Sequence, residues 1–265
     1  MSLDALVENH VLSIGRIWQQ LETREIGRHM SLYHQGVTST NAALRLLAEA
    51  GASEGVVVLA ERQATGQDLE SKLRFSPPGV NVYASVLFRP AIESAAVPVF
   101  AFIASLALAD AVRELGVQAA VKWPNDVLVE GRKVAGVRAE TLGCRTEAVG
   151  TVILGVEVNV NVTHDALQSG LGETGQFATS LREVLGHTID RNAFTARFLN
   201  HLEEWLVRYR AEGAPTVLAA WRDLDLLAGR WRKSVTVERH SRAPRSASTR
   251  RGTSRSGTVS MSAQS

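Results

Sequence analysis

The chain has 265 residues, of which 45% are hydrophobic, 21% charged and 6% aromatic, the mixture of an ordinary globular protein. Its longest nearly uncharged stretch, residues 95–109, is shorter than the roughly 18 to 20 apolar residues of a membrane-spanning helix, so we expect a buried core helix there. The N-terminus has no basic region followed by an apolar one, and we expect a cytoplasmic protein without a membrane partner. The single cysteine, Cys144, excludes an internal disulfide and a zinc finger.

The positive charge of the chain is concentrated at its C-terminus. Lys and Arg number 29 and Asp and Glu 27, a net charge of +2; six Arg and no acid lie from Arg239 onward, so the rest carries −4. This tail has no aromatic residue to stack on a base, and we expect no nucleic-acid partner. It also has little apolar surface to offset an ordering cost of about 1–2 kcal/mol per residue, which predicts disorder beyond Val235–Val237.

The first half of the chain predicts two helices and two strands. Apolar residues near helical spacing predict a helix over residues 3–25. The segment Ser39–Asn41, followed by good helix formers, predicts a capped helix that ends before Gly51. β-Branched runs at residues 56–59 and 80–88 predict two strands.

The second half continues with helices and strands. An apolar run predicts a helix over residues 99–115. Residues 149–162 alternate so regularly that the valines form a core face, while Gly155, Glu157 and Asn159 share the opposite, more polar face. The whole pattern predicts an α+β fold, a mixed β-sheet flanked by helices, with α/β as the alternative. The other predicted elements are strands over residues 117–121 and 134–139 and helices over residues 194–209 and 217–227.

The most specific string is Lys122-Trp123-Pro124-Asn125-Asp126, directly after a short apolar strand. Pro and Asn-Asp favour turns, so a polar turn is one interpretation. A lysine at a strand end beside a rigid proline can also present a fixed positive charge to a carboxylate or phosphate. Four further segments surround the string in a set order: Ser39–Asn41, Ala60–Gly66, Arg132–Val137 and Gly155–Asn161.

This set and its order resemble the bacterial biotin protein ligases from about Val37 to Val237, and the strings KWPND and RKVAG are highly specific for them. The resemblance is to the short form of the family, without an N-terminal DNA-binding domain. It implies a helical lead-in over residues 1–36 and a catalytic domain of biotin/lipoate ligase type over residues 37–228. Residues 229–265 would then be the truncated remnant of a small β domain, mostly a disordered tail.

The resemblance implies a reaction in two steps. Biotin and ATP, with Mg²⁺, give biotinyl-5′-AMP and pyrophosphate, and a lysine of a biotin carboxyl carrier protein of acetyl-CoA carboxylase then attacks the mixed anhydride. Because the biotin carboxylate and the α-phosphate are both anionic, fixed cations must screen their repulsion, and Lys122 is the implied catalytic cation that contacts both. The other implied contacts are Ser39, Thr40, Asn41, Gln63 and Gly66 for biotin, and Gln67, Asp68, Leu69, Lys133, Gly136 and Asn159 for the adenylate.

The sequence departs from the family at the phosphate loop. Where the family has GRGRRGR, this chain has GQDLESK at residues 66–72, which keeps the first glycine and one basic residue. Each charge-assisted hydrogen bond lost from an arginine costs roughly 1.5–3 kcal/mol, and Asp68 and Glu70 add repulsion. Glu157 also replaces a glycine on the face toward the site. The abrupt change beyond Val235 leaves open whether the tail is genuine or the product of a shifted reading frame.

Three functions stay open at the level of sequence. The first is an active ligase whose altered loop weakens its hold on the adenylate. The second is a catalytically impaired relative that binds biotin or the carrier, and the third is a lipoyl-type acyltransferase, whose arrangement around a catalytic Lys or Cys we do not find. The histidines lack a ligand spacing such as HExxH, so we assign no metal site. Short-form ligases often pair through sheet edges, so a homodimer is an open expectation.

Overall fold

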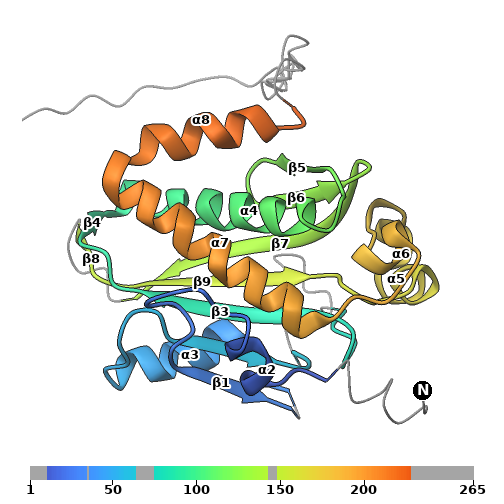
Figure 1. The fold of residues 1–265 in the computed structure, drawn as a ribbon, viewed down its shortest axis with the longest axis horizontal. Coiled ribbons are helices and arrows are strands. Elements are labelled where there is room, and N and C mark those ends of the chain that lie inside the picture. The colour runs from blue at the N-terminus through green and yellow to red at the C-terminus, as the bar shows by residue number, and fades with distance from the viewer. Residues whose placement is uncertain (1–10, 35, 64–74, 143–147, 228–265) are drawn as a thin grey trace, which may run out of the picture. The chain divides into compact units, whose positions relative to one another are not determined.

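The structure is a computed structural model that describes residues 11–34, 36–63, 75–142 and 148–227, all within one unit spanning residues 1–230 (Figure 1). Part of what the sequence predicts lies outside these residues, so the structure gives no account of it. These parts are the start of the N-terminal helix, the phosphate loop with Gly66, Gln67, Asp68 and Leu69, Cys144, and the C-terminal tail with Val235–Val237.

A seven-stranded sheet forms the centre of the unit, in the order β1-β2-β3-β9-β7-β6-β5. β1 and β2 are parallel, and every other neighbouring pair is antiparallel, which confirms the predicted mixed sheet. The strands are β1 (Met30–Tyr33), β2 (Val57–Ala60), β3 (Val82–Phe88), β5 (Ala119–Lys122), β6 (Asp126–Val129), β7 (Arg132–Thr141) and β9 (Val152–Val158), while β4 (Ile92–Glu93) and β8 (Ala148–Val149) pair separately.

Three helices cover one face of the sheet: α4 (Pro98–Arg113), α7 (Arg191–Glu212) and α8 (Ala214–Leu224) (Figure 1). By length and composition alone the stretch Ser94–Arg113 could cross a membrane, but 67% of its most apolar window is buried in the unit. Eleven of the 16 residues of α4 are buried, which confirms the prediction of a core helix. Burial of this apolar surface is the main favourable term in the stability of the fold, at about 25 cal/mol per Å² removed from water.

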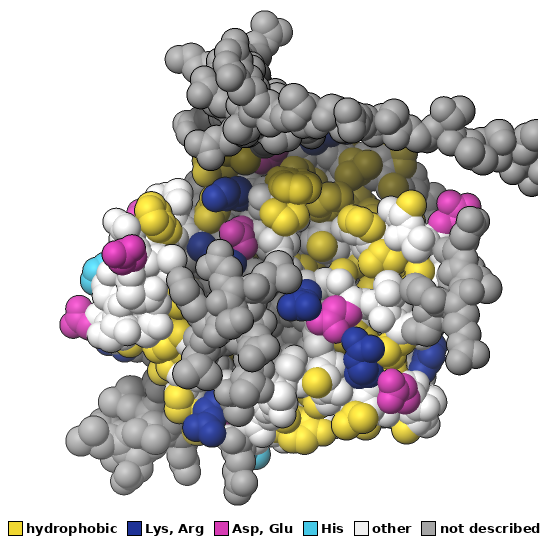
Figure 2. Space-filling view, turned by 180° about the vertical axis from the view of Figure 1, so that it is seen from behind, with side chains coloured by type: hydrophobic (Ala, Val, Ile, Leu, Met, Phe, Trp, Pro, Cys, Tyr) yellow, Lys and Arg dark blue, Asp and Glu magenta, His cyan; other side chains and the backbone are white. Residues whose placement is uncertain are grey.

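The opposite face of the sheet is covered by α3 (Thr40–Glu49) at one end and by α5 (His164–Leu171) and the 3₁₀ helix η2 (Gly172–Phe177) near the other. Leu44 of α3 packs on Val58, Leu87 and Ile153, whose strand neighbours point into the main core on the other side. Figure 2 shows this side of the molecule, where basic and acidic side chains stand next to one another with hydrophobic side chains between them.

The predicted N-terminal helix is wrong over most of its described part, because only α2 (Ile14–Trp18) is helical. From Glu22 onward several backbone N–H groups bond to side chains of α7 instead of to helical carbonyls. Glu22 N–H donates to Asn200 Oδ1 at 2.9 Å, and Ile26 N–H donates to Glu203 Oε2 at 2.8 Å. The apolar residues of this segment are therefore buried one by one in an irregular chain.

The other helices and strands predicted from the sequence are present, with shifted ends. The strand predicted over residues 149–162 extends only from Val152 to Val158; beyond its end the side-chain amide of Asn161 bonds both backbone groups of Ile189, at 2.8 and 2.9 Å. β1 and β6 were not predicted. The helices α5 and α6 (Leu181–Leu185) and the 3₁₀ turns η1 (Ser94–Ala96) and η2 were not predicted either.

Candidate active site

A buried polar cluster lies where α3 begins. Thr40 N–H donates to Gln63 Oε1 at 3.0 Å, and Ser85 Oγ lies 2.8 Å from Thr40 Oγ1 and 2.6 Å from Asn41 Oδ1. All four side chains are less than 8% exposed. Both contacts that Gln63 makes through Oε1 are with Thr40, which leaves its Nε2 group as the end able to donate to a ligand.

Ser85 is a member of this cluster that sequence analysis missed. It lies in the middle of β3, where the neighbouring side chains are apolar and every residue of the strand is buried. A lone hydroxyl in a buried strand needs a polar partner, which was the available signal. Ser39, by contrast, is only the N-cap of α3 through its carbonyl, which accepts from Ala43 N–H at 3.0 Å; its side chain makes no capping bond.

Gly155 of β9 lets α3 approach the sheet. A Cβ at this position would collide with Oδ1 of Asn41 and would lie 3.0 Å from its Cγ. Gly155 is also the register partner of Ser85, so both stand on the face of the sheet that carries the polar cluster. The glycine at this position therefore holds Asn41 within reach of Ser85.

Two residues further along β9, on the same face, a row of charged residues crosses the sheet. Residues directly opposite one another in neighbouring strands share a face, so the register places this row side by side. Its members, in order across β5, β6, β7 and β9, are Lys122, Asp126, Gly136 and Glu157.

This row lines a hollow of about 630 Å³ together with Lys133 and Asn159. Lys133 Nζ lies 2.6 Å from Asp126 Oδ1, and it passes 3.2 Å from where a Cβ on Gly136 would be, so the glycine makes room for the lysine. Lys122 is exposed, and among the described residues its ammonium group has no carboxylate partner. Its charge is available to an anion in the hollow.

The site therefore has two parts on one face of β9. Gly155 belongs to the polar cluster, Glu157 to the charged row, and Asn159 follows at the end of the strand. A strand rises about 3.3 Å per residue, so the three positions span about 13 Å. A ligand of that length with a polar head and an anionic middle fits this arrangement.

Comparison with known proteins identifies the family of the chain. Residues 33–159 match the biotin/lipoate A/B protein ligase family. The biotin–[acetyl-CoA-carboxylase] ligase of Mycobacterium tuberculosis is 32% identical over 233 residues, which cover 84% of this chain and 77% of that relative. The chain belongs to this family.

Two further relatives of the ligase family frame the comparison. The bifunctional ligase/repressor BirA of Bacillus subtilis is 31% identical over 219 residues, and the match covers 82% of this chain but 66% of that protein. The biotin protein ligase of Aquifex aeolicus in complex with biotin and ATP has the same fold, with a TM-score of 0.62 at 24% identity over 75% of this chain and 79% of that one. The predicted fold is thus confirmed.

The structure places the family's expected site residues in the two parts described above. Thr40, Asn41 and Gln63 meet in the buried cluster, whereas Lys122, Lys133, Gly136 and Asn159 surround the hollow. The loop residues Gly66, Gln67, Asp68 and Leu69 lie outside the described residues. The turn Trp123–Asn125 between β5 and β6 is fixed to β7, because the Asn125 amide donates to Val137 O at 2.6 Å.

A buried ion pair stands behind the site and was not predicted. Arg191, fully buried at the start of α7, donates to Glu61 Oε2 at 2.7 Å and to the carbonyl of Asn81 at 2.9 Å. Glu61 also accepts from Leu12 N–H at 2.9 Å. A buried guanidinium needs such partners, because an unpaired charge in the core costs several kcal/mol. This pair fixes the chain just before Gln63.

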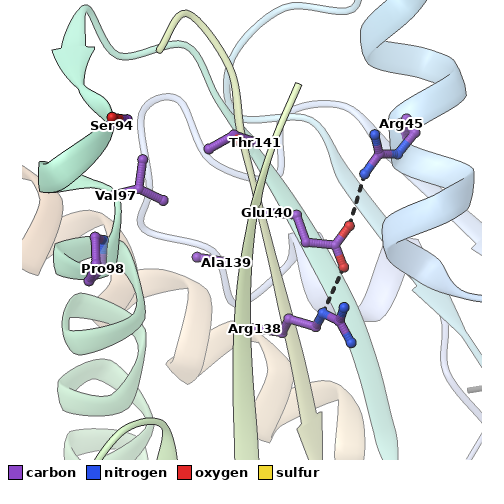
Figure 3. Close-up of a pocket in the computed structure, with 8 residues that line it drawn as sticks. All are labelled: Arg45, Ser94, Val97, Pro98, Arg138, Ala139, Glu140 and Thr141. Atoms are coloured by element: carbon purple, nitrogen blue, oxygen red, sulfur yellow. Dashed lines mark hydrogen bonds and ion pairs between the residues drawn. The ribbon is translucent and has the colours of Figure 1, made fainter. Parts of the chain in front are cut away.

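A second hollow, of about 570 Å³, lies at the other end of β7 and contains no residue predicted for the site (Figure 3). Arg45 of α3 and Arg138 both contact the carboxylate of Glu140, at 3.0 and 2.9 Å. These pairs are partly exposed, so each contributes about 1 kcal/mol or less. The Arg45–Glu140 pair joins α3 to β7 and so helps to hold the helix that carries Thr40 and Asn41.

Proposed function

We propose that this chain is an ATP-dependent biotin protein ligase, which forms biotinyl-5′-AMP and transfers biotin to a lysine of a biotin carboxyl carrier protein. The observation that carries the proposal is the common face of β9, along which a buried amide and hydroxyl cluster continues into a cation-lined hollow. Biotin has a neutral ureido head and a carboxylate tail, and the two parts of the site match these two ends.

The ureido end of biotin would lie at the start of α3. Its carbonyl oxygen accepts from the amide of Gln63 and its two N–H groups donate to oxygens of the cluster, with Thr40, Asn41 and Ser39 nearby. Gly66 is the further biotin contact expected from the family, outside the described residues. Because these groups are already held by one another, little conformational entropy is lost when the ligand enters.

The carboxylate end would then reach Lys122. In the first step a carboxylate oxygen of biotin attacks the α-phosphorus of ATP and pyrophosphate leaves; in the second the ε-amine of the carrier lysine attacks the carbonyl carbon and AMP leaves. Lys122 lowers the barrier to the first step because its charge faces two anions that must approach each other. Lys133, Gly136 and Asn159 border the space for the nucleotide, and the loop residues Gln67, Asp68 and Leu69 would close it.

ATP would enter as its Mg²⁺ complex. The described residues contain no group of three or more His, Cys, Asp or Glu side chains able to hold a metal ion. Mg²⁺ in nucleotide sites usually keeps several water molecules and is bound by the phosphates plus one or two carboxylates. Asp126 and Glu157 are the carboxylates that line the hollow, so its donor set fits an ion brought in by the substrate.

The competing proposals differ in what the hollow can do. A catalytically impaired relative would bind biotin in the buried cluster, while Glu157 and the altered loop would exclude nucleotide. The name of the relative at 32% identity, a biotin–[acetyl-CoA-carboxylase] ligase, favours biotin over a lipoyl-type substrate. The proposal also includes a cytoplasmic location and a homodimer. Its other macromolecular partner is the carrier protein, without nucleic acid. The proposed domain limits are residues 1–36, 37–228 and 229–265.

The deciding experiment measures biotin-dependent release of pyrophosphate from Mg²⁺-ATP, with labelled biotin and a biotin carrier domain present. Release together with labelled carrier supports the ligase. Release without transfer indicates an adenylate-forming enzyme that loses its intermediate. Biotin binding by calorimetry without any release would overturn the ligase in favour of the impaired relative. Sedimentation of the purified chain with and without biotin and ATP tests the homodimer.

A further inference from the structure

We propose that Asn81 is a positioning residue that fixes the orientation of the Asn159 amide, so that the hollow prefers a purine with a 6-amino group to one with a 6-oxo group. This inference rests on the proposed function, because it assumes that the nucleotide occupies the hollow. Asn81 precedes β3 and is 1% exposed, so it does not itself line the hollow.

Two backbone groups set the orientation of both amides. Val160 N–H lies 3.2 Å from Asn81 Oδ1 and can only donate, so this atom of Asn81 must be the oxygen. The Nδ2 group of Asn81 then faces Tyr83 Oη and Asn159 Oδ1, each at 3.3 Å. On the other side, Thr179 O lies 3.1 Å from Asn159 Nδ2 and can only accept. The orientation of Asn159 therefore follows from the chain itself.

The Asn159 amide keeps a free donor and a free acceptor in this arrangement. An asparagine side chain has two N–H donors and two lone pairs, and the contacts to Asn81 and Thr179 use one of each. Among the described residues nothing else bonds to its side chain, and Asn159 borders the hollow. The positions of its free N–H donor and its free lone pair are therefore fixed for a ligand in the hollow.

The surroundings of Asn159 fit a planar base. Apolar side chains line part of the hollow, and two cations, Lys122 of the charged row and Lys133, line another part of it. An apolar wall around a few polar groups is typical of sites for flat heterocycles, and cations are typical of phosphate contacts. The apolar members of this lining include Phe75, Leu128, Leu171, Phe177 and Leu227.

A fixed amide distinguishes the two kinds of purine. The 6-amino group of adenine donates and its ring nitrogens accept, whereas the 6-oxo group of hypoxanthine accepts and its N1–H donates. An asparagine that could rotate by 180° about its terminal bond would satisfy both bases equally. Held by Asn81 and Thr179, Asn159 can satisfy the two groups of only one base, which under the proposed function is adenine, and the other base leaves polar groups unpaired.

Asn81 is itself held from behind by the ion pair described above. Its carbonyl accepts from Arg191 at 2.9 Å, and the same guanidinium binds Glu61. Glu61 lies two residues before Gln63 of the biotin cluster. One buried arginine thus supports the residue that orients the base contact and the segment that carries a biotin contact.

The test is the ratio of kcat/KM for ATP to that for inosine triphosphate, measured by biotin-dependent pyrophosphate release. We expect the wild type to prefer ATP by at least about tenfold, the effect of one misplaced hydrogen bond, and Asn81→Asp to lose most of this preference. Aspartate cannot donate to Asn159 Oδ1, so it no longer holds the oxygen and nitrogen of the Asn159 amide in their places. Asn81→Ser, which is too short to reach Asn159, leaves Thr179 O as the one described contact that orients the amide, so we expect a smaller loss of the preference.

The matched control is Asn161→Asp, a buried asparagine that bonds to Ile189 and not to Asn159. It should lower the melting temperature without changing the ATP preference. A wild type that uses both nucleotides equally, or a folded Asn81→Asp with an unchanged ratio, overturns the inference. If the wild type releases no pyrophosphate at all, the ligase proposal fails, and calorimetric binding of the two nucleotides still decides between an oriented and an unoriented Asn159.

Discussion

Gly155 and Asn41 touch across the interface between β9 and α3, where a Cβ on the glycine would lie 3.0 Å from Cγ of the asparagine. Asn41 Oδ1 is in turn 2.6 Å from Ser85 Oγ. The position of α3 against the sheet, and with it the shape of the buried polar cluster, therefore depends on the absence of a Cβ at residue 155.

Gly155→Ala should weaken biotin binding by at least about tenfold, because displacing Asn41 breaks a buried hydrogen bond whose loss costs about 1–3 kcal/mol. Isothermal titration calorimetry measures the affinity. Gly150→Ala is the control, since a Cβ at Gly150 meets nothing within 4 Å. Equal affinities for the two variants would show that α3 adjusts without loss and would contradict the assigned role of Gly155.

Gln63→Glu should leave the fold intact and weaken the binding of biotin. Oε1 of Gln63 accepts from both donors of Thr40, and a carboxylate can accept from them as well. The substitution removes the only donor of the side chain, so the ureido carbonyl meets an oxygen instead, at a cost of about 10-fold or more in affinity. Thermal unfolding and calorimetry on the same samples separate the two effects, with Gln168→Glu, at a half-buried position of α5, as the control.

Lys122→Ala should abolish adenylation, a loss of at least about 10²-fold, because no other described cation takes the place of this ammonium group on the charged row. Pyrophosphate release measures it. Arg113→Ala removes a cation from the far end of α4 and should leave the rate unchanged. If pyrophosphate release survives in Lys122→Ala, the lysine is not the central cation.

His201 should make the stability of the domain depend on pH. Burial of His201 lowers its pKa, but hydrogen bonds to Glu204 and Glu114 and the charges of both carboxylates outweigh burial, so the pKa of the imidazole is raised. Nε2 lies 2.8 Å from Glu114 Oε1 and Nδ1 3.0 Å from Glu204 Oε2, joining α7 to the end of α4. Arg197 also contacts Glu114, at 3.1 Å.

Because the pKa is raised in the folded state, the stabilisation is fully present below the unfolded value of about 6.5 and is lost as the pH rises through the folded value. His201→Gln should therefore lower the free energy of unfolding at pH 6, by about 1 kcal/mol or less, and have little effect at pH 8.5. Urea unfolding at the two pH values measures this difference. A larger effect at pH 8.5 would mean that neutral His201 carries the contact.

The predictability of the fold varied with the strength of the hydrophobic pattern. α4 and β9 were predicted because long runs of buried apolar residues define them. β1 was missed because it has only four residues, three half-buried and one exposed, and their burial does not alternate along the strand. β6 was missed because it begins at Asp126, inside a string interpreted as a turn.

The sequence indicated several residues of the candidate site but not how the fold brings them together. The sequence indicated Lys122, Gly136 and Glu157 as separate motifs, and only the strand register places them in one row. Ser85 and Asn81 were missed, because each acts through contacts made by segments far apart in the chain. A local pattern can indicate that a buried hydroxyl needs a partner, but it does not show which distant segment supplies one.

The outer edge of β5 is covered by the chain that follows α8. Val121 and Asp225 form a bridge, and Leu226 N–H donates to Val121 O at 2.8 Å. Leu226 and Leu227 are also part of the wall of the hollow that the charged row lines. During synthesis this part of the wall is completed late: until residue 227 has left the ribosome, the outer edge of β5 lacks this cover and is open to association with other chains. Under the proposed function, the nascent domain then has no closed place for a nucleotide.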